Sequence, residues 1–134
     1  MGMIHYYDIG HAEVFVFDHF IIKQVKEGQS SDLLNTSDME VIIKEHFENK
    51  NMAYISNRAN SYSVNPLVYK DIEKISNLVA IAVVSNSRSM KLSAKYESKF
   101  YSKPFEVFDN LNDAVQWVSA VIEITNDQKT TKSS

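Results

Sequence analysis

The side chains of this chain that could do chemistry gather between Asn57 and Pro66. That stretch reads Asn-Arg-Ala-Asn-Ser-Tyr-Ser-Val-Asn-Pro, with one Arg, two Ser, three Asn and no acid. Amides, hydroxyls and a guanidinium can together hold an anion or hydrogen-bond to a partner. A second polar run, from Ser85 to Arg88, adds another Arg and two more hydroxyls. These two stretches are the candidate binding loops.

Each candidate loop follows an apolar run that reads as a strand. Met52 to Ser56 precedes the first loop, and Leu78 to Val84 precedes the second. The second run has no polar residue, which is typical of a strand covered on both faces and flanked by parallel neighbours. In open α/β sheets ligands bind beyond the carboxyl ends of the strands, so parallel neighbours would place both loops on one rim. The predicted site residues there are Asn57, Arg58, Asn60, Ser61, Tyr62, Ser63, Asn86 and Arg88.

The same residues also have a purely structural interpretation. Ser and Asn commonly cap helices and fill turns. Asn65 and Pro66 have the order expected at a helix start, with Asn as the cap and Pro in the first helical position. Tyr62, an aromatic residue within a polar loop, either inserts into the core or projects outward to contact a partner.

The rest of the chain has an opening group of strands, followed by alternating helices and strands. Apolar and β-branched runs near 6–9, 13–17 and 20–25 predict strands, and Asp18-His19 forms either a tight turn or a bulge. Ser37 and Glu40 have capping-box spacing and predict a helix start. We also predict a helix that begins at Pro66 and a helix from about Met90 to Tyr101. A strand over 105–108 and a final helix from Asn110 complete the prediction. We predict an α/β fold: a mixed sheet with an initial antiparallel strand pair and about four helices.

Length and composition indicate one globular domain. A chain of 134 residues, 44% apolar and 23% charged, can bury a single sizeable core. We place the domain at 1–124. Residues 125–134 carry no apolar side chain, and we predict a disordered tail there.

Several functional classes are disfavoured by composition. A net charge of −3 without a Lys/Arg cluster argues against nucleic acid. Four scattered histidines and no cysteine disfavour a metal site, and three glycines disfavour a nucleotide phosphate loop, so no cofactor is expected. No apolar run is long enough to span a bilayer, and the first residues do not read as a signal peptide. We expect a cytoplasmic protein.

The order of elements resembles the STAS fold, and most closely its SpoIIAA-like branch, whose prototype is a bacterial anti-sigma-factor antagonist. The segment from Phe105 to Val118 is similar to that branch's closing strand and helix. Asn60-Ser61-Tyr62-Ser63 stands where STAS antagonists carry an Asp-Ser-Ser-Gly-like switch, with Asn, Tyr and Ser replacing three of its residues. The resemblance implies that Ser61 holds the place of the serine that a partner kinase phosphorylates.

Three functional hypotheses follow. The first is a non-enzymatic regulatory module that docks a protein partner through residues 57–65, with docking modulated by phosphorylation of Ser61. The alternative is a Sec14-like carrier of a small apolar molecule or lipid. The third is an enzyme that uses Arg58, Ser61 and a histidine. The sequence shows no pattern for a general base or an oxyanion hole that would support it. A homodimer through the early strands or the last helix is compatible with each of them.

Overall fold

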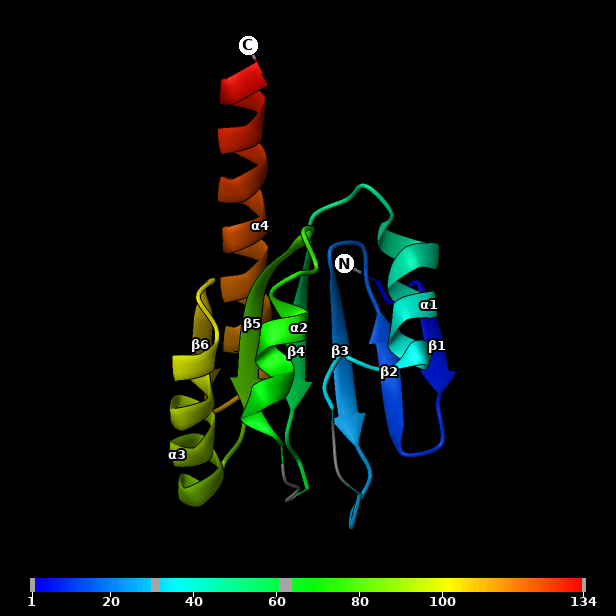
Figure 1. Ribbon diagram of the computed structural model, residues 1–134, viewed down its shortest axis with the longest axis vertical. Helices are drawn as coiled ribbons and strands as arrows, with labels where there is room; N and C mark the ends of the chain where they lie inside the picture. Colours follow the sequence, from blue (N-terminus) through cyan, green and yellow to red (C-terminus); the bar gives the residue numbers. More distant parts are fainter. Residues whose placement is uncertain (1, 30–31, 61–63, 134) are drawn as a thin grey trace.

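A single mixed sheet organises the chain. The computed structural model describes residues 2–29, 32–60 and 64–133, and side chains up to residue 128. The sheet has six strands, which lie side by side in the order in which they occur along the chain. They are β1 (His5–Asp8), β2 (Ala12–Val16), β3 (Phe20–Val25), β4 (Met52–Asn57), β5 (Leu78–Val84) and β6 (Phe105–Phe108). Figure 1 shows the six strands in this order.

The predicted fold class is confirmed. The first three strands form two antiparallel pairs, β1 with β2 and β2 with β3. The pairs from β3 to β6 are all parallel. Asp18 and His19 form a tight turn, because the amide of Phe17 donates to the carbonyl oxygen of Phe20 at 2.9 Å.

The helices lie on both faces of the sheet, in unequal numbers. The α-helices are α1 (Ser37–Phe47), α2 (Tyr69–Ile72), α3 (Arg88–Glu97) and α4 (Leu111–Ser133), and short 3₁₀ turns at Pro66–Val68 and Ser98–Phe100 adjoin α2 and α3. Helices α1, α2 and α3 each connect two neighbouring parallel strands and cover one face (Figure 1). Of the helices in the described part of the chain, only α4 lies on the other face. Because the strand order is sequential, three helices on one face mean that all three crossovers have the same hand.

Each face of the sheet has its own apolar core. Beneath α1, α2 and α3, side chains such as Val14, Ile21, Tyr54 and Ile81 form the larger cluster. Residues one position away on the same strands point to the α4 side, as period-two alternation requires. β5 lies between β4 and β6 and is parallel to both. This central, doubly covered position explains why its sequence lacks polar alternation.

The helix starts agree in part with the capping predictions. Asn65 caps the 3₁₀ turn that opens with Pro66, its side chain accepting from the amide of Leu67 at 3.1 Å. The cap of α1 is Thr36, whose hydroxyl accepts from the amide of Met39 at 3.3 Å, so the prediction of Ser37 as the cap was wrong by one residue. Thr36 has the extended backbone that a cap requires, whereas Ser37 is already helical.

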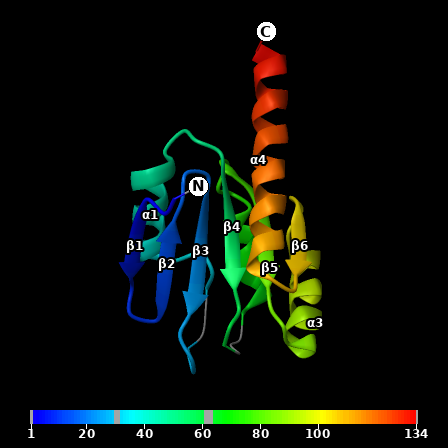
Figure 2. The same cartoon turned by 180° about the vertical axis from the view of Figure 1, so that it is seen from behind.

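The last helix extends beyond the residues that form its apolar face. α4 continues to Ser133 and includes residues 125–133, the segment for which a disordered tail is predicted from sequence. Figures 1 and 2 show these last turns projecting beyond the end of the sheet. None of the described helices is both long and apolar enough to cross a membrane.

The capping assignment can be tested with two neighbouring substitutions. Thr36→Ala removes the side-chain acceptor at the start of α1 and should lower the free energy of unfolding by about 1 kcal/mol. Ser37→Ala, one residue later, should change it by less than about 0.5 kcal/mol. Urea unfolding followed by circular dichroism measures both, and a larger loss for Ser37→Ala would contradict the assignment.

Candidate functional site

The two candidate loops lie on the same rim of the sheet. β4 and β5 are parallel neighbours, and Asn57 lies opposite Val84 at their carboxyl ends. The contact continues past the strands, because the amide of Arg58 donates to the carbonyl oxygen of Val84 at 2.8 Å. The loops after β4 and β5 therefore leave the sheet side by side.

Arg58 points into the protein instead of toward solvent. Only 3% of the residue is exposed. Its guanidinium donates two hydrogen bonds to the carboxylate of Glu97 on α3: Nη1 to Oε2 at 2.6 Å and Nη2 to Oε1 at 2.7 Å. This two-bond geometry is the strongest and most directional form of a carboxylate–guanidinium pair.

Two further side chains form hydrogen bonds with this ion pair. The hydroxyl of Tyr69 on α2 donates to Glu97 Oε1 at 2.7 Å, and Arg58 Nε donates to the hydroxyl of Ser56 on β4 at 3.2 Å. Burial raises the pKa of the Tyr69 hydroxyl far above its ordinary value, and the negative charge of Glu97 raises it further. Tyr69 is therefore a permanent donor at physiological pH. We call these four residues the Arg58–Glu97 cluster.

The Arg58–Glu97 cluster joins three elements that are distant in sequence. Ser56 and Arg58 come from the end of β4, Tyr69 from α2 and Glu97 from the end of α3. Two charges removed from water are stable together only when hydrogen bonds satisfy both, as they do here. The base of the first loop is therefore fixed to the helical layer.

Asn57 and Asn60, at the start of the first loop, also form hydrogen bonds with the protein interior. Asn57 Nδ2 donates to the side-chain oxygen of Gln24 at 3.2 Å, and Asn60 Nδ2 donates to the carbonyl oxygen of Val25 at 3.1 Å. Both partners lie at the end of β3. The first loop is thus tied to β3 on one side and, through Arg58, to α3 on the other.

The second loop presents its predicted residues to solvent. Asn86 and Arg88 are both exposed. Ser87 caps α3, its hydroxyl accepting from the amide of Met90 at 3.3 Å. The buried Ser85 accepts from the amide of Ser87 at 3.1 Å. Ser61, Tyr62 and Ser63, the remaining predicted site residues, lie outside the described residues.

A buried lysine lies beside the Arg58–Glu97 cluster and was not predicted. Lys23 on β3 is opposite Ser56 and 0% exposed. Its Nζ donates to the carbonyl oxygen of Leu33 at 2.6 Å. Leu33 has a φ of 57°, a left-handed conformation that few residues other than glycine adopt. Burial lowers the pKa of Lys23 to about 8.

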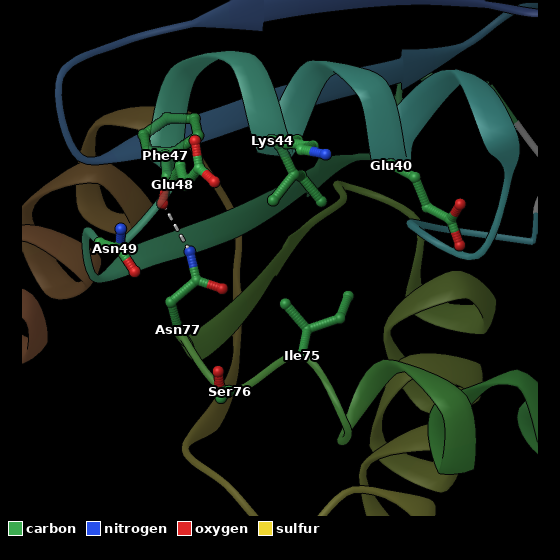
Figure 3. A pocket seen from close by; sticks show the side chains of 9 residues that line it. Glu40, Lys44, Phe47, Glu48, Asn49, Ile75, Ser76 and Asn77 are labelled. Carbon is green, nitrogen blue, oxygen red and sulfur yellow. Dashed lines mark hydrogen bonds between the residues drawn. The ribbon is translucent and has the colours of Figure 1, made fainter.

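The surface groove shown in Figure 3 lies away from the rim. It has a volume of about 300 Å³ and an apolar floor of Ile43, Phe47 and Ile75. It is bordered by Asn77, whose Nδ2 donates to the carbonyl oxygen of Phe47 at 2.9 Å. This groove is at the end of α1, near the amino ends of β4 and β5. The rim and the groove are therefore separate features.

The described residues of the second loop present amide, hydroxyl and guanidinium groups to solvent. Among the described residues, no group of three or more His, Asp or Glu side chains could hold a metal ion. The charged groups of the Arg58–Glu97 cluster neutralise one another, while the exposed groups are amides, hydroxyls and Arg88. No protein-family model, curated protein or solved structure matches this chain.

The contribution of the Arg58–Glu97 cluster to stability can be measured. Glu97→Gln leaves the Arg58 guanidinium buried without a counter-charge and should cost about 3 kcal/mol of unfolding free energy. Tyr69→Phe removes one hydrogen bond to a charged acceptor and should cost about 1.5–2 kcal/mol. The matched control is Tyr96→Phe on the exposed side of α3, expected to be neutral. Chemical denaturation that found all three equal would contradict the assigned roles.

The buried Lys23 predicts a pH dependence of a particular sign. Its folded pKa of about 8 lies below the ordinary value of 10.5, so between these pH values the unfolded chain holds more protons. Raising the pH from about 8 towards 10 should therefore stabilise wild type relative to Lys23→Met, by up to about 1.4 kcal/mol per pH unit. Below pH 8 the difference should be constant. Denaturation curves across this range measure it, and a pH-independent difference would refute the prediction.

Proposed function

We propose that this protein is a non-enzymatic regulatory module that docks a protein partner through the rim formed by the loops after β4 and β5. The observation that carries the proposal is the Arg58–Glu97 cluster. It holds the base of the first loop rigidly while the second loop leaves Asn86 and Arg88 exposed beside it. A preorganised polar surface of this kind binds with a smaller entropy cost than a flexible one.

The internal pairing of Arg58 favours a module over an enzyme. A catalytic guanidinium must reach the reacting group, but this one is 3% exposed and makes two bonds to Glu97. Employing it on a substrate would leave Glu97 buried beside Tyr69 without its counter-charge. Its role here is to position the loop.

The resemblance to STAS antagonists supplies a mode of regulation for the same rim. Ser61 stands at the switch position, between the anchored residue Asn60 and the helix start at Pro66. A phosphate there would add close to two negative charges at the rim, changing its complementarity to a partner. We propose that phosphorylation of Ser61 weakens docking.

The experiment compares capture of partners by immobilised variants of the full chain. Arg88→Glu and Ser61→Asp each add negative charge to the rim, and each should reduce capture of a specific partner at least about tenfold. Lys44→Glu makes the same charge reversal on α1, away from the rim, and should capture as wild type does. Captured proteins are quantified by mass spectrometry.

One result would refute docking at the rim, and another would refute only its regulation by phosphorylation. Equal capture by wild type and both rim variants would show that the rim is not the docking surface. If the Arg88→Glu variant lost the partner while Ser61→Asp retained it, and Ser61 were unmodified in the intact mass of protein from its own cells, docking would stand and the phosphorylation switch would fall.

A further inference from the structure

The face of the sheet opposite α1, α2 and α3 is only half covered. α4 contacts β4, β5 and β6, and Figure 2 shows β1 and β2 without a helix over them on this side. A sheet face that carries large apolar side chains is normally buried under another layer.

Aromatic side chains from neighbouring strands form the centre of this uncovered half. Tyr6 lies opposite Phe15, which lies opposite Ile22. The rings of Tyr6 and Phe15 are 5.2 Å apart, and Tyr6 is 42% exposed. Ile4 extends the pairing of β1, because its amide donates a hydrogen bond to the carbonyl oxygen of Val16, and it is 53% exposed. We define the open sheet face as Ile4, Tyr6, Phe15 and Phe17, of which the two phenylalanines are partly buried.

The charges around the open sheet face are predominantly acidic. At one end Asp8 lies opposite Glu13. At the other, a groove of about 450 Å³ separates the β2–β3 turn from α4, with apolar side chains Phe20 and Ile122 and three acids among its lining residues. These acids are Asp18, Glu123 and Asp127. Two lysines offset part of this charge, Lys26 at 3.0 Å from Asp8 and Lys50 at 3.8 Å from Asp18.

We propose that the open sheet face and the adjoining groove dock a basic amphipathic helix of another protein. Its apolar side would cover Tyr6 and Phe15, and its Lys or Arg side chains would approach Asp18 and Glu123. Three neighbouring strands span about 10 Å, which is close to the diameter of one helix. The occupant would lie beside α4 and complete the helical layer on this face.

Charge favours a basic partner over a second copy of this chain. In a two-fold dimer the same surface meets itself, so the acidic border of one copy would face that of the other. Like charges brought together across an interface oppose association. A basic helix instead matches the acids at both ends of the open sheet face. This surface does not include Asn86 or Arg88, so the inference is independent of docking at the rim.

The test uses a defined probe, an amphipathic peptide of Leu and Lys of roughly 18 residues, about five helical turns. Isothermal titration against the full chain should show binding, and an otherwise identical Leu/Glu peptide should bind at least about tenfold more weakly. The double variant Ile4→Ser, Tyr6→Ser should weaken binding about tenfold, and Glu123→Lys about threefold to tenfold. Matched controls on other surfaces are Leu92→Ser on α3 and Glu48→Lys directly after α1, both expected to bind as wild type does.

The altered side chains are on the surface, so every variant should fold. A cooperative thermal unfolding transition verifies this for each one. Equal binding of the Leu/Lys peptide to wild type and to the double variant would overturn the proposal, as would equal binding of the two peptides. Light scattering provides another decisive outcome. A wild-type dimer that Tyr6→Ser dissociates would show that a second copy covers this face.

Discussion

The two-bond ion pair between Arg58 and Glu97 is the interaction on which the arrangement of the rim depends. Arg58 follows the buried strand β4 directly, at a position where the chain leaves the sheet beneath α2 and α3. A guanidinium there must be paired, because an isolated buried charge costs several kcal/mol. Glu97 supplies the counter-charge from the end of α3, and Tyr69 donates to it from α2. The packing of two helices is thereby coupled to the path of one loop.

This coupling divides the polar residues of one rim into those that support the loop and those that face solvent. The side chains of Asn57, Arg58 and Asn60 all form hydrogen bonds with other residues of the protein. Asn86 and Arg88, on the loop alongside, point into solvent. A rim of this kind offers a shaped, preorganised surface, and preorganisation increases affinity without additional contacts. The docking role that we propose for this protein rests on this division.

Local sequence patterns predicted the sheet and its helices because each depends on neighbouring residues. The unbroken apolar run of β5 indicated a doubly covered strand, and Asn65-Pro66 indicated a helix start; both predictions were confirmed. The sequence could not decide whether Thr36 or Ser37 caps α1. Both side chains can cap a helix, and only the backbone geometry distinguishes them. The placement of the loops after β4 and β5 on one rim was also confirmed, since parallel pairing required it.

The partners of the buried charges could not be predicted, because they are far apart in sequence. Arg58 and Glu97 are 39 positions apart, and nothing local links them. A signal was nevertheless present: Met90, Ala94 and Glu97 share the buried side of α3, so an acid interrupts an apolar stripe. Lys23 likewise interrupts the apolar β3. Charges at inward positions indicate a buried partner, but only the fold identifies it.

The coupling of the rim to α3 is tested most directly by amide hydrogen exchange, comparing wild type with a Glu97→Gln variant by mass spectrometry. We predict a larger acceleration of exchange in two separate segments, residues 56–60 and 92–98, than in β2 and β3, because loss of the ion pair opens the rim locally as well as lowering the global free energy of unfolding. Equal acceleration in all segments would show that Glu97 contributes only to global stability. Unchanged exchange at residues 56–60 would contradict the claim that the ion pair anchors the loop.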